Sequence, residues 1–549
     1  FTSAAVGYAH PYFHAAKRRN CFHPETKIWF EDEDGRWHYD RIDSFVEQRL
    51  DPESAAQDDF GTLIQELDGE VFVPSLNQDG EIVRKPVQAV SKHHATDHMV
   101  SIETRSGREV TVTPDHDVHV FDGTGVSAKM ASAVTEEDSL VTPTDLDVVE
   151  PSADPKQFDL LAEFLSTPEI DPDTLMVKGL EKEFLYDLFE SVLADDWDGK
   201  FYPLQSTANH LGLTKKALSN YLYRESIPAS ILLELLGSSE EVRSRIPGDV
   251  QLGMKRDRTE IDRMVTLDQD LATLIGYYTA EGFARKQETP KGTIHQTTIS
   301  GVESAAREFF VATFQNAFGV EPYRENHAKI TVSGRLLRVF FDTVLDAGIS
   351  AENKHVPELI FDQPDHIVAA YLSGYFSGDG RVDKSSLLVS ATTVSRELKE
   401  DLMALLTRLG ITARVETTDP VRLNEKFPGY YDDSDTSTSR EGYVLKISST
   451  DAVVFYQTVG FHLPRKRRRL QNHVETTDPI GRRVFDGGNG EYLIDEIAAV
   501  TYTASEIEHT YSLTVPDTHS VIVNDTSQKQ CDGDEDCVML LMDGLLNFS

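Results

Sequence analysis

Cysteine is nearly absent from this sequence, which has three in 549 residues. So few cysteines exclude a disulfide-bonded scaffold and are typical of a protein in the reducing cytoplasm, where we expect this chain to reside. No apolar run approaches the roughly 18 residues that a membrane-spanning helix needs, so no membrane partner is expected. The chain opens on Phe1 without a signal-peptide pattern, which suggests a piece of a longer protein.

Basic residues are also scarce. Lysine and arginine total 53 against 92 aspartates and glutamates, which gives a formal net charge of -39. Phosphate contacts need cations, so one interpretation is that the protein never meets nucleic acid. The other is adaptation to molar salt, where a dense carboxylate surface keeps proteins soluble. The acids are spread along the whole chain rather than gathered in a tail, which favours the second interpretation.

The composition changes several times along the chain, and 549 residues predict three or four domains. Residues 1–20 carry three basic residues and no acid. Residues 21–145 read as short strands and turns, with a β-hairpin in which Val100–Ile102 and Glu109–Val112 flank a Ser-Gly turn. Residues 155–250 have helical periodicity, 262–475 hold an internal repeat, and 485–530 return to strands. A β module split by an insertion is therefore expected, followed by a short segment, 531–549.

Within the helical segment, the residues from Ser206 to Pro228 have the pattern of a helix-turn-helix. A short helix is expected to end near Leu211 and Gly212, with a second one over Lys215–Arg224. A second helix of this kind can enter a DNA major groove. An ordinary pair of packed helices is an equally good interpretation. The side chains expected to face DNA are Lys215, Lys216, Asn220 and Arg224.

The internal repeat consists of two segments, LIGYYTAEG and LSGYFSGDG, at an offset of 98 residues. In each, small residues at a spacing of four form a stripe along one helix face, which lets two helices approach closely. Directly after each stripe comes an acid, Glu281 or Asp379. Two helices packed on these stripes would bring both carboxylates together, where they could bind Mg²⁺ and activate water. Core packing alone explains one stripe but not its duplicate. The stripes are Ala272, Gly276, Ala280 and Ala370, Gly374, Gly378.

These two motifs resemble those of the LAGLIDADG homing endonucleases over roughly 200 residues. The resemblance implies two pseudo-symmetric αββαββα halves and Mg²⁺-dependent cleavage of double-stranded DNA. The family also has a lysine near the metal in each half, for which Lys354 and Lys466 are the best matches. The order of proline and lysine is reversed at Lys466. The basic run around it offers phosphate contacts through Arg465, Arg467 and Arg468.

A different chemistry is suggested at the ends of the segment 21–530. Cys21 can attack the carbonyl before it and convert the Asn20–Cys21 peptide bond into a thioester. Thr113 and His116 lie at a spacing of three in TVTPDH, and histidine is the acid or base most available near pH 7. Cys531 can then accept the acyl group. Finally, the side-chain amide of Gln530 can attack its own carbonyl and release the segment.

This order of parts resembles that of inteins, with CFHPET, TVTPDH and HTYSLTVPDTHSVIVND as the matching blocks. The resemblance implies an all-β, horseshoe-shaped HINT fold, no cofactor for splicing, and a role for His519. Three positions depart from the family pattern: Gln530 replaces the usual asparagine, Lys529 replaces the penultimate histidine, and Ser512 occupies an acid or cysteine position. The departures predict slow or conditional splicing.

Joining the flanks creates the sequence NCDGDED across the junction. The flanks, 1–20 and 531–549, resemble the catalytic loop of the large subunit of archaeal D-family DNA polymerases, in a haloarchaeal form. The resemblance makes Asp532 and Asp534 the metal-binding aspartates of that enzyme. It also makes the polymerase small subunit a partner of the spliced product. An acidic surface run is the plainer interpretation of DGDED.

Together these patterns predict a multi-domain chain: an all-β HINT fold split by an α+β LAGLIDADG endonuclease and a small helical insertion. The expected function is self-splicing combined with cleavage of host-gene DNA that lacks the insertion. Two alternatives remain open. The endonuclease could be inactive and serve only as a DNA-binding module, or the HINT fold could cleave without ligating.

Overall fold

The computed structural model describes residues 21–57, 61–151, 154–193, 203–290, 292–418, 441–482, 484–486 and 491–530. The chain divides into two compact units. One contains the residues up to Ser152, Gly380–Gly460 and the residues from Lys466 onward, and the other contains Ala153–Asp379 with Phe461–Arg465. Among the described residues, no helix is both long and apolar enough to cross a membrane.

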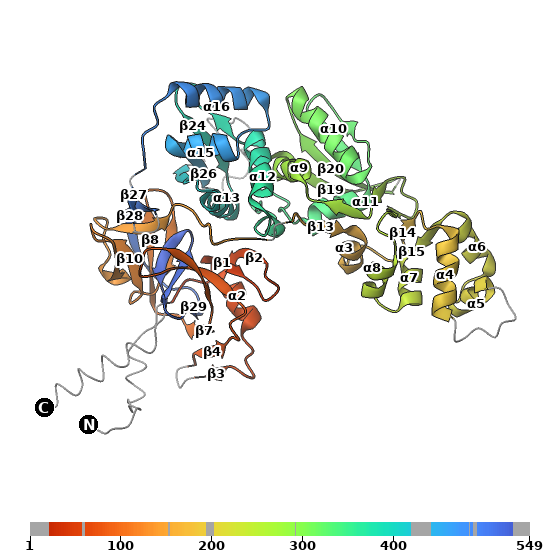
Figure 1. The fold of residues 1–549 in the computed structure, drawn as a ribbon, viewed down its shortest axis with the longest axis horizontal. Helices are drawn as coiled ribbons and strands as arrows, with labels where there is room; N and C mark the ends of the chain where they lie inside the picture. The colour runs from red at the N-terminus through yellow and green to blue at the C-terminus, as the bar shows by residue number, and fades with distance from the viewer. Residues whose placement is uncertain are drawn as a thin grey trace. The chain divides into compact units, whose positions relative to one another are not determined.

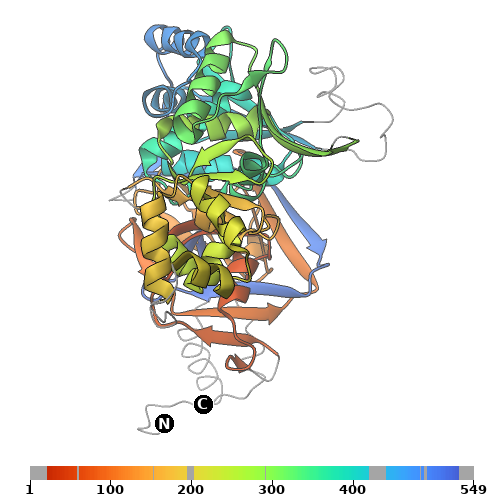
Figure 2. The same cartoon turned by 90° about the vertical axis from the view of Figure 1, so that its right-hand side faces the viewer.

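The first unit is built on a β fold whose strands come from both ends of the chain (Figures 1 and 2). Its larger sheet has the order β6-β5-β1-β30-β31-β10-β12-β28-β8-β9, so strands from the two ends of the chain, such as β1 and β30, are neighbours. Alternating β-branched residues form one shared core, which includes Ile28, Val118 and Val521. The early strands are β1 (Lys27–Glu31), β2 (Trp37–Arg41), β3 (Ala56–Gln57), β4 (Leu63–Glu66), β5 (Phe72–Leu76), β6 (Ile82–Pro86), β7 (Ala89–His94), β8 (His98–Thr104), β9 (Glu109–Val112), β10 (Asp117–Phe121), β11 (Val126–Met130) and β12 (Ser139–Pro143). The late strands are β27 (Val484–Asp486), β28 (Glu491–Ala504), β29 (His509–Thr514), β30 (Ser520–Val523) and β31 (Thr526–Lys529).

The hairpin expected from the sequence is present as β8 and β9, with Val100 opposite Val112 and Ile102 opposite Val110. Helix α2 (Ile42–Arg49) packs on the same β fold through Ile42, Phe45 and Val46.

The two repeat segments each begin a series of elements in the order αββαββα, as expected. The sheet orders, β19-β20-β22-β21 and β23-β24-β26-β25, are the same in both halves. The first half contains α9 (Gln269–Glu281), β19 (Gly282–Thr289), β20 (Gly292–Ser300), α10 (Ser304–Phe318), β21 (Tyr323–Arg324), β22 (Lys329–Ser333) and α11 (Arg335–Val339), with a π-helical turn over Phe340–Val344. The second contains α12 (Asp365–Gly378), β23 (Arg381–Val382), β24 (Leu388–Thr393), α13 (Arg396–Arg408), β25 (Arg414–Thr418), β26 (Gly442–Ser448) and α15 (Thr450–Thr458), followed by α16 (Pro464–Thr476).

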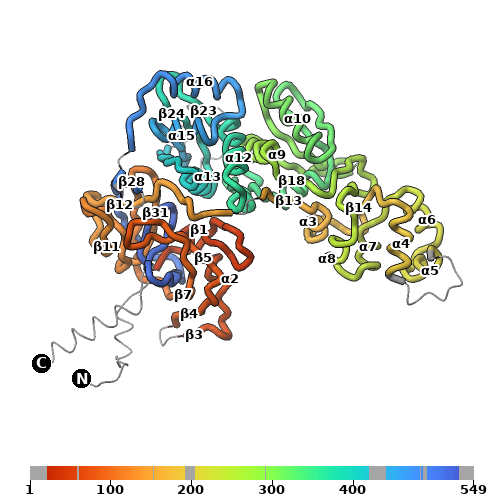
Figure 3. Tube along the Cα trace, in the orientation of Figure 1, coloured from red at the N-terminus to blue at the C-terminus, as the bar shows by residue number. Residues whose placement is uncertain are grey.

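The segment expected to be helical also supplies two strands, β14 and β15, to a four-stranded sheet of order β15-β14-β16-β17, whose other two strands follow residue 250. Strands of three or four residues are too short to show a periodicity of two, which explains why they could not be predicted from the sequence. The helices, traced in Figure 3, are α3 (Leu160–Ser166), α4 (Lys182–Leu193), α5 (Pro203–His210), α6 (Lys215–Tyr223), α7 (Ala229–Leu236) and α8 (Ser239–Arg245). The strands are β13 (Gln157–Asp159), β14 (Leu175–Lys178), β15 (Ser226–Pro228), β16 (Gln251–Met254), β17 (Glu260–Asp262) and β18 (Met264–Thr266).

Helix α13 of the second repeat half contacts the β fold of its own unit through buried charged groups. Lys27 on β1 lies with its Nζ 2.6 Å from Asp401 Oδ1, and both side chains are buried. The guanidinium of Arg108 donates to Thr407 Oγ1 at 3.2 Å, and the Thr407 hydroxyl lies 3.2 Å from Asp525 Oδ2. The repeat half thus supplies counter-charges and hydrogen bonds to side chains that the β fold buries.

Removing one member of the Lys27–Asp401 pair should destabilise the first unit strongly. We expect Asp401→Asn to lower its free energy of unfolding by about 3 kcal/mol, because the buried Lys27 ammonium then loses its 2.6 Å partner and keeps the more distant Glu397 at 3.4 Å. The double variant Lys27→Met with Asp401→Leu should lose much less than the sum of its single variants. Urea unfolding followed by the fluorescence of Trp29 and Trp37 measures both values.

A matched control is the exposed ion pair between Arg36 and Asp34, at 3.3 Å. Asp34→Asn should change stability by less than about 0.5 kcal/mol. Equal losses in Asp34→Asn and Asp401→Asn would contradict the buried-pair account.

Candidate functional sites

Helices α9 and α12 pack backbone against backbone along their small-residue stripes (Figure 1). A Cβ atom added at Gly276 would lie 2.0 Å from Tyr371 O, and one added at Gly374 would lie 2.0 Å from Thr273 O. The Thr273 hydroxyl is also 3.2 Å from Ala370 O, across the helix pair. No larger side chain fits at either glycine, so this approach depends on the residues that the repeat provides.

The close approach brings the two acidic residues to one end of the helix pair. Glu281 is the last residue of α9, and Asp379 is the C-cap of α12. A Cβ added at Gly378 would lie 3.4 Å from Glu281 Cγ, so the Glu281 stem rests against the residue before Asp379. Glu281 is exposed and Asp379 partly exposed, which leaves their oxygens accessible from solvent.

Lys354 and Lys466 occupy equivalent places in the two halves. Lys354 Nζ donates to Gly282 O at 3.1 Å and to Tyr278 O at 3.2 Å, and Lys466 Nζ donates to Gly380 O. Each lysine thus binds the carbonyl of the glycine that follows the acid of its own half. Burial lowers the pKa of Lys354 to about 8, although Asp379 and Glu281 act to raise it.

The donor set at the helix ends suits a hard divalent cation. Mg²⁺ commonly binds one or two protein carboxylates and completes its shell with water and substrate phosphates. Glu281 and Asp379 supply two such carboxylates. Within the described residues, no group of three or more histidine, cysteine, aspartate or glutamate side chains could hold a metal ion. Phosphate oxygens and water would therefore have to supply the other ligands.

The cations expected to contact DNA differ in their surroundings. Arg465 is paired with Glu303 at 2.9 Å, whereas Arg467 and Arg468 are exposed on α16. Helix α6 begins at Lys215 after the cap residue Thr214, whose hydroxyl accepts a hydrogen bond from Ala217 N. The expected DNA-facing side chains of this helix and its C-cap are all exposed, namely Lys215, Lys216, Asn220 and Arg224.

Cys21 is buried in the β fold with Thr113 beside it. Thr113 N donates to Cys21 O at 3.1 Å, and Cys21 N lies 3.5 Å from Thr113 Oγ1. The next residue, Phe22, forms two backbone hydrogen bonds with Tyr511 of β29. Phe22 N donates to Tyr511 O at 2.8 Å, and Tyr511 N donates to Phe22 O at 3.1 Å. The two arms of the β fold together hold the residue expected to be the nucleophile.

His116 is completely buried, and its ring stacks edge-on against Phe22 at 4.7 Å between ring centroids. Among the described residues, neither of its ring nitrogens has a hydrogen-bond partner. Burial lowers the pKa of His116 to about 3, with a smaller contribution from His119. At neutral pH the imidazole is therefore uncharged and carries one N–H and one lone pair.

At the other end of the segment, Gln530 is in direct contact with His519. Gln530 Nε2 lies 3.3 Å from His519 Nδ1 and donates to Val515 O at 3.2 Å. The backbone N–H of Gln530 donates to His519 O at 3.0 Å. Lys529, at the penultimate position, has its Nζ 3.9 Å from Asp117 Oδ2 on the neighbouring strand.

The structure therefore describes the contacts of all three residues that depart from the family pattern, namely Gln530, Lys529 and Ser512. Ser512 is fully buried, and in the part of the chain described here its hydroxyl has no hydrogen-bond partner. Cys531, Asp532, Asp534 and Asn20 lie outside the described residues, so the contacts predicted for them are not observed.

His119 is a neighbour of these sites that the sequence did not single out. Its Nδ1 lies 2.9 Å from Ser527 Oγ, and burial, with Lys529 nearby, lowers its pKa to about 4. The alternation along β10 could have indicated it, because Asp117 and His119 share a strand face beside β31.

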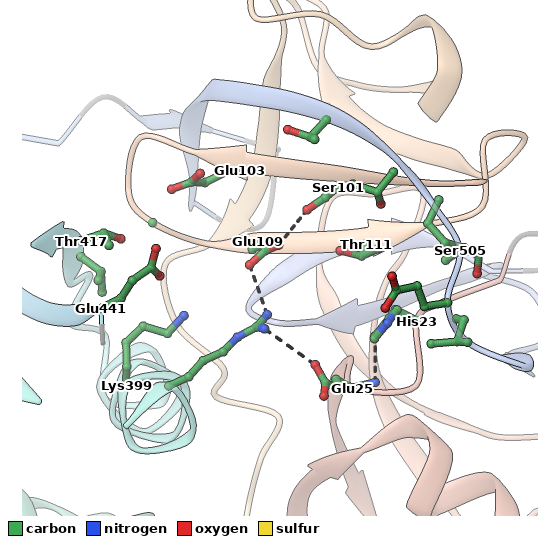
Figure 4. Close-up of a pocket in the computed structure, with 18 of the residues that line it drawn as sticks. His23, Glu25, Ser101, Glu103, Glu109, Thr111, Lys399, Thr417, Glu441 and Ser505 are labelled. Carbon is green, nitrogen blue, oxygen red and sulfur yellow. Dashed lines mark hydrogen bonds and ion pairs between the residues drawn. The ribbon is translucent and has the colours of Figure 1, made fainter. Parts of the chain in front are cut away.

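A groove of about 1010 Å³ lies between the β8–β9 hairpin and α13 (Figure 4). Arg396 crosses it and pairs with Glu109 at 3.1 Å and with Glu25 at 3.7 Å. Glu109 in turn accepts from Ser101 Oγ at 2.7 Å. These pairs link the two walls, and we interpret the groove as part of the packing between the β fold and α13.

Two family descriptions match parts of the chain. Residues 366–460 match the LAGLIDADG-like domain. Residues 1–30 and 514–549 match the catalytic domain of the DNA polymerase II large subunit DP2.

Several curated relatives are DNA polymerase II large subunits. That of Haloquadratum walsbyi is 40% identical, covering 100% of this chain and 25% of the relative. That of Thermococcus kodakarensis is 33% identical, covering 100% of this chain and 28% of the relative. The Halobacterium salinarum protein is 60% identical over 26% of this chain and 10% of its own length. The chain thus spans about a quarter of the relatives that it matches throughout.

Solved structures similar to parts of the chain include a transcription factor IIB mini-intein and I-DmoI in complex with DNA and Ca. The mini-intein match covers 24% of this chain and 71% of that chain, at 18% identity and a TM-score of 0.22. The I-DmoI match covers 38% and 99%, at 16% identity and a TM-score of 0.28.

Proposed function

Because this chain is an intein with a LAGLIDADG endonuclease domain, set in a DNA polymerase II large subunit, we propose that it excises residues 21–530 from itself. The excision joins Asn20 to Cys531. The observation that carries this proposal is the contact between Gln530 Nε2 and His519 Nδ1, which places a proton acceptor on the amide that must act as nucleophile.

At the first junction, Cys21 Sγ attacks the carbonyl carbon of Asn20. A C–S bond forms, the C–N bond breaks, and the nitrogen of Cys21 takes a proton. Thr113 Oγ1 lies near that nitrogen. The neutral His116, three residues further along the chain, has an N–H to donate. Cys531 Sγ then takes the acyl group from Cys21 Sγ, so the total number of thioesters stays at one.

At the second junction, Gln530 Nε2 attacks its own backbone carbonyl carbon and forms a six-membered imide. The peptide bond to Cys531 breaks, His519 Nδ1 accepts a proton from Nε2, and the departing amine gains one. The released amine of Cys531 attacks the thioester and leaves Asn20 and Cys531 joined by an ordinary peptide bond. Lys529 faces Asp117, so His519 takes the role of the missing penultimate histidine.

Mass spectrometry of the chain, expressed with tagged flanks and refolded in molar salt, tests the proposal. A ligated flank product together with a free 21–530 segment is the expected result. Free but unjoined flanks would indicate cleavage without ligation and contradict the proposal.

His116 makes the stability of the fold depend on pH. The unfolded histidine titrates near 6.5 and the folded one near 3, so between these values only the unfolded chain binds the proton. Stability is therefore complete above pH 6.5 and falls with acidification. At pH 5 the loss should be about 2 kcal/mol.

Urea unfolding of a splicing-blocked chain at pH 7.5 and pH 5 measures this loss. A His116→Gln variant cannot titrate and should lose about 2 kcal/mol less than its parent over the same interval. The same pH-dependent loss in both chains would contradict the account.

We also propose that the helix pair α9 and α12 cleaves double-stranded DNA with Mg²⁺ held by Glu281 and Asp379. The paired carboxylates and the equivalent positions of Lys354 and Lys466 support this second activity. When bound, Mg²⁺ would supply charge stabilisation at the phosphate and an activated water. The exposed Lys215, Lys216, Asn220, Arg224, Arg467 and Arg468 are the proposed DNA contacts, and Arg465 would first have to leave Glu303.

The substrate would be the host gene at the site where the insertion is absent. For the spliced product we propose DNA polymerase activity with Mg²⁺ at Asp532 and Asp534, in a complex with the polymerase small subunit. The match of residues 1–30 and 514–549 to the polymerase catalytic domain supports this assignment.

A further inference from the structure

His519 has an unusual backbone conformation for a residue with a side chain. Its φ is +51°, in the left-handed region, which is disfavoured for residues other than glycine. Asp517, two residues earlier, is also left-handed, with a φ of +69°. A backbone in this state persists when its surroundings hold it there. The left-handed turn at His519 therefore needs contacts that hold it in place.

The residues before and after His519 are hydrogen-bonded to strand β5 through their hydroxyl groups. Ser75 Oγ lies 2.6 Å from Thr518 Oγ1, 2.7 Å from Ser520 O and 2.9 Å from Ser520 Oγ. Ser520 Oγ accepts from Leu76 N at 2.8 Å and lies 2.7 Å from Leu76 O. Ser75 and Ser520 have no exposed surface.

Each hydroxyl has one proton, which limits the hydrogen bonds it can donate. Ser520 Oγ donates to Leu76 O, and Ser75 Oγ donates its proton to Ser520 O or to Thr518 Oγ1. Ser75 thus connects β5 to the residues before and after His519. Because the bonds between Ser75 and Ser520 are buried, losing one leaves a polar group without its partner in an environment that water does not reach.

We infer that Ser75, Thr518 and Ser520 form a hydroxyl clasp that positions His519 against Gln530. The clasp fixes the residues before and after His519, and it thereby holds the left-handed turn in which Nδ1 reaches the Gln530 amide nitrogen at 3.3 Å. Ser75 is a positioning residue, since it acts through His519 and touches no reacting atom. The inference rests on the proposed release of the segment at Gln530.

The test measures each junction separately in Ser75→Ala. Release of the 531–549 flank is followed by mass spectrometry in a Cys21→Ala chain with tagged flanks, in molar salt. Cleavage at Cys21 is followed with dithiothreitol in a Gln530→Ala chain. Ser75→Ala should slow the release of the flank about five- to tenfold, the scale of one lost hydrogen bond. It should leave the cleavage at Cys21 unchanged within about twofold.

A double variant distinguishes positioning from a general loss of structure. In a His519→Ala chain, adding Ser75→Ala should slow the release no further, because the group that Ser75 positions is gone. A matched control is Ser390→Ala, since Ser390 is also a buried serine but lies on β24 of the repeat half. It should change neither rate.

Three outcomes would overturn the clasp: no effect of Ser75→Ala, an equal slowing at both junctions, or the same slowing with and without His519. No release of the flank from the Cys21→Ala chain that retains Ser75 would overturn the proposed function itself. That result is recognisable because it occurs before Ser75 is changed.

Discussion

Replacing Glu281 by Gln or Asp379 by Asn should lower DNA cleavage at least about a thousandfold, the scale of losing an essential group at an active centre. Each change keeps the shape of the side chain but removes half of the negative charge that holds Mg²⁺ at the ends of α9 and α12. Splicing should continue at its original rate, because Glu281 and Asp379 belong to the helix pair and not to the groups proposed to act in splicing. Cleavage of DNA carrying the uninterrupted host junction, at saturating Mg²⁺, measures the effect.

Asp270→Asn is the matched control for this prediction. Asp270 is an exposed acid in the first turn of α9, at the opposite end of the same helix from Glu281. Its loss should leave cleavage unchanged within about twofold, since it alters the interaction with the helix dipole and the charge near His462 but neither of the paired acids. A fall in activity for Asp270→Asn as large as that for Glu281→Gln would show that the helix, and not the paired acids, is the sensitive feature.

The second large effect concerns the two ends of the spliced segment. Cys21→Ala should abolish ligation, and Gln530→Ala should abolish release of the downstream flank, each by at least about a thousandfold. The two blocks should differ in kind. With Gln530→Ala, dithiothreitol should still cleave the chain at Cys21, because the thioester forms without the glutamine. With Cys21→Ala, dithiothreitol should not cleave the chain at this junction, because no thioester forms.

Gln528→Ala is the control for Gln530→Ala. Gln528 is an equally buried glutamine on the same face of the same chain segment, and its amide donates to Thr526 Oγ1. Its loss should cost stability without stopping release. A complete block in Gln528→Ala would assign the effect to damage of strand β31 rather than to the reacting amide.

Much of the helix-pair site could be predicted from the sequence because its determinants repeat. Small residues at a spacing of four, each stripe followed by an acid, describe a close helix contact and its chemistry directly, and Gly276 and Gly374 lie at that contact. The equivalence of Lys354 and Lys466 was harder to see, because the order of proline and lysine differs. Only the reach of each side chain to a glycine carbonyl makes it evident.

Other features had no periodic signal to detect. Ser75 and Ser520 are 445 residues apart, and nothing in the local sequence of either residue predicts their contact. Lys27 and Asp401 look like ordinary surface charges in a chain with 92 acids, and only their burial shows otherwise. The β14–β17 sheet was missed because its strands are so short. These contacts depend on tertiary packing, which one sequence without periodicity does not reveal.

The buried charges between α13 and the β fold also affect how such an element can be inherited. A gene copy that lost only its central part would encode a β fold in which Lys27 has lost Asp401 and Arg108 has lost Thr407. Its product would unfold more easily and splice less, and the host enzyme would stay interrupted. Selection on the host therefore opposes gradual erosion from the middle. We expect descendants of this gene to keep the element entire, to lose it cleanly, or to carry compensating changes at Lys27 and Arg108.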